Sequence, residues 1–306
     1  MKVLLATQKP FAAAAVDAIR GIVENAGHQF VTLEKYADES ALVEAVADAD
    51  ALIVRSDKVT PAVLDAAVRL RIVVRAGAGY DNVDLVAATA HNVVVMNTPG
   101  QNSNAVAELA VAMMIFMARN QFTPATGTEI YGKTLGIQAF GHVGRLVAAK
   151  AAALGMTVKA IDPFLSDEQI REGGAEPVSS LEELYSSCDY VSVHIPATPQ
   201  TIGSIGYELI TSMPKGAVLV NTARKEVMDE AGLDKALADR PDLKYVADVA
   251  PDNIEQLKEK YGLRVFATPK KMGAQSAEAN INAGLAAARQ ICDYFATGNT
   301  RFQVNK

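Results

Sequence analysis

A glycine turn near the middle of the chain is the clearest candidate for chemistry. The segment TLGIQAFGHVGRLVAAKAAALGMTVKAID has the pattern of a strand, a tight turn, a helix and a second strand that ends in an acid. Gly141 and Gly144 match the second and third glycines of a dinucleotide-binding turn. One lets the backbone approach a pyrophosphate, and the other lets the helix pack closely on the strand. The helix that begins near His142 would offer free N–H groups to the phosphates, and Ala139 replaces the first glycine of the pattern.

The acid at the end of this segment selects between two nicotinamide cofactors. Asp162 lies about 20 residues beyond the turn, where a carboxylate accepts hydrogen bonds from ribose hydroxyls. Its charge would repel a 2′-phosphate, and the next two residues, Pro163 and Phe164, bring no arginine to compensate. The segment therefore predicts a site for NAD rather than NADP.

Two arginines indicate a second site, for an anion. Arg55 and Arg75 each end an apolar run that is typical of a β-strand. In a parallel sheet such strand ends fall on one edge, so the two cations would converge on one anionic group. We therefore expect a small phosphorylated substrate, and Lys58 could assist in binding it.

These residues need a framework that brings strand ends together. Short apolar, β-branched runs alternate with helical patterns along nearly the whole chain, which is typical of parallel sheets covered by helices. We expect two doubly wound parallel-sheet domains of the α/β class, one over 1–97 plus 281–306 and one over 98–280. Periodicity alone does not establish that the last helix, from about 275 to 296, returns to the first domain. The expected strands are Val3–Ala6, Gln29–Thr32, Ala51–Val54, Ile72–Val74, Val93–Met96, Thr134–Ala139, Thr157–Ile161, Tyr190–His194, Ala217–Val220, Tyr245–Ala247 and Val265–Ala267.

The overall composition argues against several classes of protein. The net charge over 306 residues is −6, whereas a general nucleic-acid binder needs a basic surface. No uncharged apolar stretch reaches the roughly 18 residues of a membrane span, so no membrane partner is expected. Cys188 and Cys292 stand in no metal or redox spacing, which predicts reduced thiols, a cytoplasmic protein and no metal ion.

Four motifs occur in the order seen in one enzyme family. RAGAGYDNVD (75–84), NTPGQNSNAVAEL (97–109), the glycine turn and LVNTARKEVMDEAGL (219–233) resemble the D-2-hydroxyacid dehydrogenases, and VRSDKVT (54–60) resembles their phosphoglycerate branch. The resemblance implies a flavodoxin-like substrate-binding domain and a Rossmann NAD-binding domain. It also implies NAD-dependent oxidation of D-3-phosphoglycerate to 3-phosphohydroxypyruvate, the first step of serine biosynthesis, without a C-terminal regulatory domain. A homodimer through the nucleotide-binding domain is implied as well, and the apolar helix over about 102–119 suits that role.

The same resemblance assigns roles to individual residues. Arg224, in NTARKE, matches the arginine that holds the substrate carboxylate and polarises the forming carbonyl. Gly77 belongs to a segment that resembles the family loop whose backbone amides receive that carboxylate. Ser56 and Asn104 stand at further substrate-binding positions. The implied cofactor contacts are Gly141, His142, Val143, Gly144, Asp162, His194, Thr222, Ala223, Asp248 and Gly273.

The general acid–base of the family departs here from its usual form. A histidine paired with a glutamate is expected, but TPKKMGAQSAEA (268–279) has lysines in this segment, and Asn253 stands at the glutamate position. A carboxylate beside a lysine would raise a pKa that is already about 10.4, whereas an asparagine removes that influence and adjacent cations lower one another's pKa. Lys270 and Lys271 are both candidates for the acid–base, because the alignment needs a one-residue insertion that the sequence does not locate.

Two other functions stay open at this point. A hydroxypyruvate or glyoxylate reductase of the same family would leave Arg55 and Arg75 without a phosphate to bind. A non-catalytic NAD-sensing protein would explain the loss of the histidine–glutamate pair, but not the retention of Arg224. The segment 120–130 is also shorter than the corresponding family stretch, so an arginine supplied there in relatives has no counterpart here.

Overall fold

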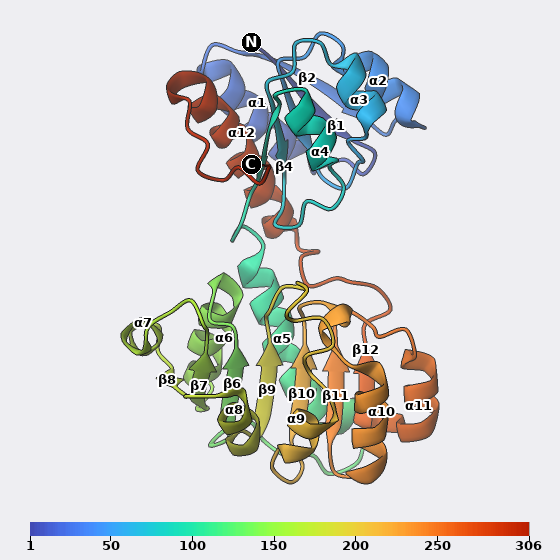
Figure 1. Cartoon of the computed structure of the whole chain (residues 1–306), viewed down its shortest axis with the longest axis vertical. Helices are drawn as coiled ribbons and strands as arrows, with labels where there is room; N and C mark the ends of the chain where they lie inside the picture. Colours follow the sequence, from blue (N-terminus) through green and yellow to red (C-terminus); the bar gives the residue numbers. More distant parts are fainter. Residues whose placement is uncertain (306) are drawn as a thin grey trace. The chain divides into compact units, whose positions relative to one another are not determined.

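Two compact units make up the protein. The structure, a computed structural model, describes residues 1–305. One unit comprises residues 1–102 together with the C-terminal segment from residue 275, and the other comprises residues 103–274 (Figure 1). The chain therefore passes between the units at 102/103 and 274/275, where the sequence analysis expected 97/98 and 280/281. Within residues 1–305, none of the helices has the length and apolar character needed to span a bilayer.

The first unit is built on a five-stranded parallel sheet with the order β2-β1-β3-β4-β5. Both faces of this sheet are buried: Val3 and Leu5 belong to one core, and Leu4 and Ala6 belong to the other. The strands are β1 (Lys2–Thr7), β2 (Gln29–Glu34), β3 (Ala51–Val54), β4 (Ile72–Arg75) and β5 (Val94–Asn97), and the helices are α1 (Ala13–Asn25), α2 (Glu39–Val46), α3 (Pro61–Ala66), α4 (Leu85–Ala90) and α12 (Ala277–Thr297).

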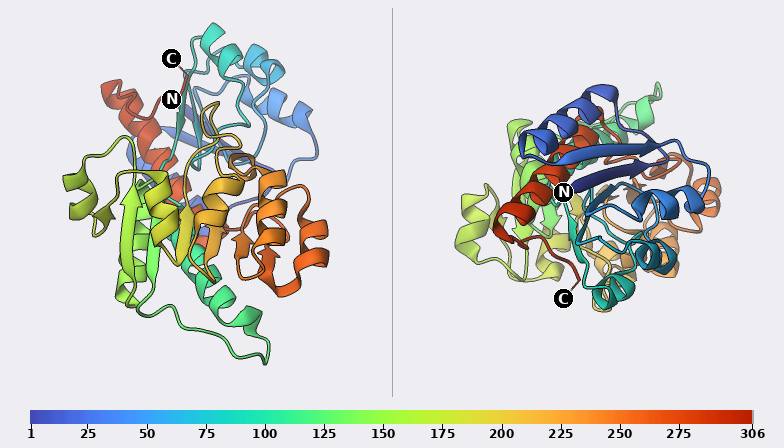
Figure 2. Two further views of the ribbon diagram at one scale, coloured as in Figure 1. Left: turned by 60° about the horizontal axis from the view of Figure 1, so that its bottom comes forward. Right: turned by 90° about the horizontal axis from the view of Figure 1, so that it is seen from above.

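The last helix of the chain belongs to this first unit. α12 packs beside α1 over one face of the five-stranded sheet, and the two helices lie next to each other in Figures 1 and 2. Ala283, Ala287 and Ile291 share a core with Val3 of β1. A Cβ at Gly284 would stand 2.7 Å from Cδ1 of Ile19, so the small residue allows this close approach. The first unit is thus discontinuous in sequence.

The second unit is built on a seven-stranded parallel sheet with the order β12-β11-β10-β9-β6-β7-β8. The strand order reverses between β6 and β9, and sheets of this kind bind ligands beyond the carboxyl ends of the strands at that point. The strands are β6 (Thr134–Gln138), β7 (Thr157–Ile161), β8 (Glu176–Pro177), β9 (Tyr190–Val193), β10 (Val218–Asn221), β11 (Lys244–Ala247) and β12 (Val265–Ala267). The α-helices are α5 (Ser103–Ala118), α6 (His142–Ala153), α7 (Asp167–Glu172), α8 (Leu181–Ser187), α9 (Tyr207–Ser212), α10 (Glu230–Asp239) and α11 (Ile254–Tyr261), with short 3₁₀ helices η1 (Asn120–Phe122), η2 (Lys225–Val227) and η3 (Gly262–Arg264).

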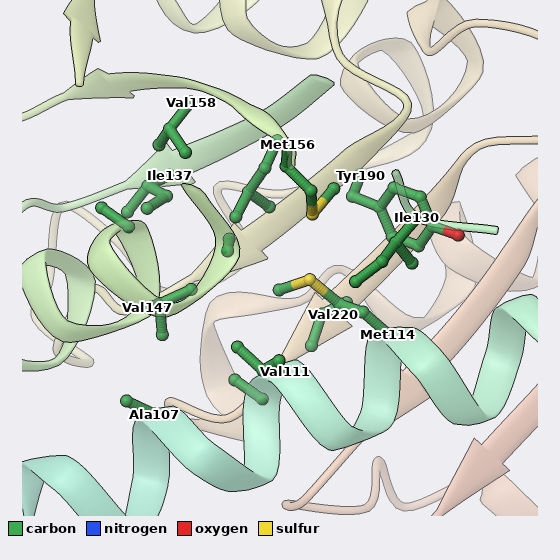
Figure 3. Packing of buried hydrophobic residues seen from close by; sticks show 14 of the residues in the cluster. Ala107, Val111, Met114, Ile130, Ile137, Val147, Met156, Val158, Tyr190 and Val220 are labelled. Carbon is green, nitrogen blue, oxygen red and sulfur yellow. The ribbon is translucent and has the colours of Figure 1, made fainter. Parts of the chain in front are cut away.

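Helix α5 forms much of the core of the second unit. Ala107, Val111 and Met114 point from this helix toward the sheet, where Figure 3 shows them beside Val147 of α6 and Ile137 of β6. The expectation of two parallel-sheet α/β domains is confirmed by the two sheets. Strand β8 was not expected from the sequence, because its two residues carry no readable periodicity.

Candidate active site

The glycine turn joins β6 to α6, and its two glycines serve different purposes. Gly141 is the N-cap of α6 in an extended conformation, and a Cβ built there would meet nothing within 4 Å. A Cβ at Gly144 would lie 2.4 Å from the carbonyl oxygen of Ala139. The fold itself therefore requires a glycine at 144. At 141 the missing side chain leaves open space at the helix N-terminus, where a pyrophosphate would need it.

Ala139 adopts the backbone conformation of the glycine that it replaces. Its φ is +76°, in the left-handed region that non-glycine residues rarely occupy. Its N–H donates to the carbonyl of Ile161 at 2.9 Å, which fixes the turn against β7. The departure from the sequence pattern therefore leaves the shape of the turn intact, at a cost in local strain.

Asp162 lies directly beside this turn, at the end of β7. Its Oδ2 accepts a hydrogen bond from the backbone N–H of Phe140 at 2.8 Å, and its Oδ1 accepts one from Phe164 at 2.9 Å. Each carboxylate oxygen keeps a further acceptor site, because a carboxylate has about four lone-pair positions. The acid is thus oriented by the turn and still able to receive ribose hydroxyls. His142, in the first turn of α6, is exposed, and Val143 is half-buried.

The turn after β10 is locked by a residue that the sequence analysis did not single out. Asn221 is buried, accepts from the N–H of Ala223 at 3.0 Å and donates from Nδ2 to the carbonyl of Arg224 at 2.9 Å. The Arg224 side chain is half-buried, and its Nη1 donates to the carbonyl of Ala223 at 2.9 Å. The signal was present in the sequence, since an asparagine that ends an apolar strand commonly bonds to the backbone two residues on.

His194 reaches the same turn from the end of β9. Its Nε2 lies 3.0 Å from Oγ of Ser192, and its Nδ1 lies 3.4 Å from Oγ1 of Thr222. Burial lowers the pKa of His194 to about 4, so the ring is neutral near pH 7. A neutral imidazole has one N–H donor and one acceptor nitrogen, which lie here beside the hydroxyls of Ser192 and Thr222.

The loop that carries the two lysines is held by a carboxylate. Asp248 is buried at the end of β11 and accepts from the N–H groups of Met272 and Gly273, both at 2.8 Å. The hydroxyl of Thr268 donates to its Oδ1 at 3.0 Å. Both lysine side chains, of Lys270 and Lys271, are exposed. Asp248 is also an expected cofactor contact, and these hydrogen bonds show that its oxygens hold the loop as well. Asn253, which the sequence analysis places where a glutamate is expected, begins α11.

The arginines of the first unit lie at neighbouring strand ends. β3 and β4 pair with Val54 opposite Arg75, so Arg55 follows directly at the same edge. Nε of Arg75 donates to the carbonyl of Arg55 at 2.8 Å. Gly77 has a φ of +150°, and a Cβ there would stand 1.5 Å from Nη1 of Arg75. The guanidinium thus occupies the space that a side chain at position 77 would fill, so this conformation depends on the glycine.

The other substrate candidates occupy less defined positions. Ser56 is exposed and lines a small cavity with Lys58, and Asn104 donates to Glu108 on α5 at 2.7 Å. Asp57, which lies between Ser56 and Lys58 in the sequence, is buried. It accepts hydrogen bonds from the Gln8 N–H and the Tyr36 hydroxyl, both at 2.7 Å. It joins three loops at this edge of the sheet, a role that the sequence analysis missed. In the described part of the chain no three His, Cys, Asp or Glu side chains gather as a metal would require.

Comparison with known sequences identifies similar proteins. Residues 105–269 match the family described as D-isomer specific 2-hydroxyacid dehydrogenase, NAD binding domain. The D-3-phosphoglycerate dehydrogenase of Methanocaldococcus jannaschii is 37% identical over 290 residues, which cover 90% of this chain and 55% of that protein. The protein of the same name from Rattus norvegicus is 41% identical over 233 residues, 71% of this chain and 43% of that one. The chain spans about half the length of these curated relatives.

Solved structures include relatives of similar length. The NAD⁺-bound 3-phosphoglycerate dehydrogenase of Entamoeba histolytica has a TM-score of 0.87 and 48% sequence identity, covering 100% of this chain and 99% of that one. A D-2-hydroxyisocaproate dehydrogenase has a TM-score of 0.83 over 100% of both chains at 19% identity, so this likeness shows the fold alone.

Proposed function

We propose that this chain, which belongs to the D-isomer specific 2-hydroxyacid dehydrogenase family, oxidises D-3-phosphoglycerate to 3-phosphohydroxypyruvate with NAD, the first step of serine biosynthesis. The observation that carries the proposal is the pair Arg55 and Arg75 at one sheet edge. Two guanidiniums at one sheet edge match the charge of a phosphate dianion, whereas a hydroxy acid without phosphate would bring no such dianion to this edge. The similarity to an Entamoeba histolytica enzyme over nearly the full length of both chains supports the same substrate.

The second unit would hold the cofactor. When bound, NAD supplies the acceptor for the hydride that leaves C2 of the substrate. Gly141, His142, Val143 and Gly144 at the start of α6 would receive the pyrophosphate, and Asp162 would receive the adenosine ribose. Residues after β9, β10, β11 and β12 complete the proposed contacts, namely His194, Thr222, Ala223, Asp248 and Gly273.

Substrate binding would use residues with distinct charges and donors. Arg55, Arg75 and Ser56 would bind the phosphate, and backbone amides at Gly77 would receive the carboxylate. Arg224 would also hold the carboxylate and polarise the forming carbonyl, and its turn is already rigid because of Asn221. Asn104 is a further substrate candidate at the start of α5.

One of the exposed lysines after β12 would transfer the proton. In the oxidative direction a neutral amine at Lys270 or Lys271 would accept the hydroxyl proton, and in the reductive direction the ammonium would donate it. Because Asp248 fixes the Thr268–Gly273 loop, the lysines extend from a defined backbone. The oxidation rate should rise with pH in the alkaline range, since the fraction of neutral amine rises.

We further propose a cytoplasmic homodimer that pairs through α5. The outer side of this helix forms an apolar groove lined by Leu109, Ala112, Met113, Ile115, Phe116, Phe122, Phe266 and Thr268. Phe122 is 69% exposed, and a run of three left-handed residues, Asn120 to Phe122, presents it. The proposal is supported by the apolar groove, since exposed patches of this kind are typical of protein interfaces, and by two free cysteines, which are compatible with a reducing compartment.

The test of the proposed reaction measures NADH formation with D-3-phosphoglycerate and with D-glycerate at alkaline pH. We expect turnover of the phosphorylated substrate, and a loss of about 10²–10⁴-fold in rate for Arg224→Ala and for one of the variants Lys270→Ala and Lys271→Ala. Lys215→Ala, which removes an exposed lysine of the same unit, should match the wild type.

Three results would change the assignment. Equal rates with D-glycerate and D-3-phosphoglycerate would favour a hydroxy acid without phosphate. NADH binding without turnover of any hydroxy acid would favour a cofactor-sensing protein. An oxidation rate that stays flat through the alkaline range would exclude a lysine as the proton acceptor.

A further inference from the structure

The Arg55 guanidinium is oriented by groups that carry no charge. Its Nη2 donates to Oδ1 of Asn280 at 2.7 Å, and its Nη1 donates to the carbonyl of Lys9 at 3.3 Å. The guanidinium carbon also lies 5.0 Å from the centre of the Phe11 ring. Among the described residues 1–305, Arg55 takes part in none of the salt bridges. Its direct contacts therefore fix the geometry of the cation without pairing it with a carboxylate, and the buried Asp57 attracts it only at longer range.

Asn280 has its own orientation fixed within α12. Its Nδ2 donates to the carbonyl of Ser276 at 2.9 Å, and Ser276 caps the helix by accepting from the N–H of Ala279 at 3.0 Å. Because the amide nitrogen is committed to Ser276, the amide oxygen is the group that faces Arg55. The first turn of α12 thus sets the direction of a guanidinium 225 residues earlier in the chain.

We infer that Asn280 is a positioning residue for phosphate recognition: it aims the Arg55 guanidinium at the phosphate of the substrate while leaving its charge free. The residue type matters. A carboxylate at this position would pair with Arg55 and repel the phosphate, and an apolar side chain would not orient the guanidinium. Pre-orientation lowers the entropy that a long side chain loses when it binds an anion. The identity of the substrate in this inference rests on the proposed function, but the anion site does not.

A merely structural role makes different predictions. If the Asn280–Arg55 bond only ties α12 to the sheet, its loss should lower thermal stability and affect all substrates alike. If it positions Arg55, its loss should weaken binding of phosphate-bearing ligands and leave other ligands unchanged. The two roles are therefore separated by comparing ligands with and without phosphate.

The experiment uses Asn280→Ala, Arg55→Ala and the double variant in the full chain. Alanine is a strong helix former, so α12 should be retained. Inorganic phosphate binding, measured by calorimetry, should weaken about two- to tenfold in Asn280→Ala, because the Arg55 side chain must then be ordered when the anion binds. KM for D-3-phosphoglycerate should rise by a similar factor with kcat changed less than about twofold, because a remote binding contact is removed. Asn282→Ala, at an exposed position of the same helix, is the matched control and should bind phosphate as the wild type does.

The double variant decides whether Asn280 acts through Arg55. Adding Asn280→Ala to Arg55→Ala should cause no further loss of phosphate binding, since the group that it positions is already gone. Independent, additive losses would overturn the inference, and so would unchanged phosphate binding in Asn280→Ala. If phosphate binding follows the expected pattern but D-3-phosphoglycerate is not oxidised, the proposed function fails while the positioning role stands.

Discussion

The contrast between Gly141 and Gly144 yields a prediction that separates folding from cofactor binding. Gly141→Ala adds a methyl group to open space at an extended backbone position. Alanine has less backbone freedom than glycine in the unfolded chain, which stabilises the fold by about 0.4–1 kcal/mol. Alanine is also a poorer helix N-cap than glycine, which costs a similar amount. The free energy of unfolding should therefore change by less than about 0.5 kcal/mol.

Cofactor affinity should respond quite differently to the same change. The added methyl group occupies the space in which the pyrophosphate would meet the N–H groups of α6. Loss of one or two charge-assisted hydrogen bonds, at about 1.5–3 kcal/mol each, lowers affinity by roughly 10–10⁴-fold. Titration of NADH by fluorescence gives the dissociation constant, and differential scanning calorimetry gives the melting temperature of the same sample.

Gly144→Ala is the matched comparison, with the opposite signature. Its Cβ would lie 2.4 Å from the backbone oxygen of Ala139, and a backbone atom has little freedom to move away. Overpacking of this kind costs about 1–3 kcal/mol, which corresponds to a fall of roughly 2–12 °C in the melting temperature of a unit of this size. Wild-type NADH affinity in Gly141→Ala would refute the assignment of this turn to the pyrophosphate.

Three further predictions concern other parts of the molecule. Ala139→Gly relieves a left-handed alanine, worth about 1–2 kcal/mol, against an unfolded-state cost of about 0.4–1 kcal/mol, so thermal unfolding should show a slight gain in stability; a lower melting temperature would contradict the strain. The pKa of His194 is about 4 in the folded chain and about 6.5 in the unfolded chain. The contribution of its neutral ring to the free energy of unfolding is therefore fully present above pH 6.5 and is lost as the pH falls toward 4. The loss between pH 7 and pH 5 should be about 2 kcal/mol in urea unfolding, and a variant His194→Asn with an unchanged pH dependence would disprove this source. Phe122→Asp places a charge on the apolar groove and should convert the proposed dimer to monomers in analytical ultracentrifugation, whereas Phe164→Asp, at a 92% exposed position away from the groove, should leave the dimer intact.

The sequence carried enough information for the architecture and for much of the candidate site. The alternation of short apolar runs with helical patterns predicted both parallel sheets, because strands that are buried on both faces by helices have this pattern. The spacing of Gly141, Gly144 and Asp162 predicted the turn and the acid beside it, since local geometry follows from local residues. Arg55 and Arg75 were expected at one sheet edge, and adjacent parallel strands place them there.

What the sequence did not reveal depends on contacts between distant segments. Asn280 bonds to Arg55 across 225 residues, and no periodicity in α12 points to that partner. The sequence also did not show that the carboxylate of Asp248 bonds the loop 24 and 25 residues later. The left-handed conformation of Ala139 is likewise set by its neighbours, because alanine has no local preference for it.

The return of α12 to the first sheet has a consequence for how the chain is made. Strands β1 to β5 are complete by Asn97, but α12, which together with α1 covers one face of them, begins only at Ala277. The 180 residues from Asn97 to Ala277 take roughly 10–35 s to synthesise at about 5–20 residues per second. During that interval, part of an apolar sheet face is uncovered on the ribosome while the whole second unit emerges and folds. The nascent first unit is therefore a natural client for a holding chaperone, and a ribosome stalled before residue 277 should release an aggregation-prone fragment.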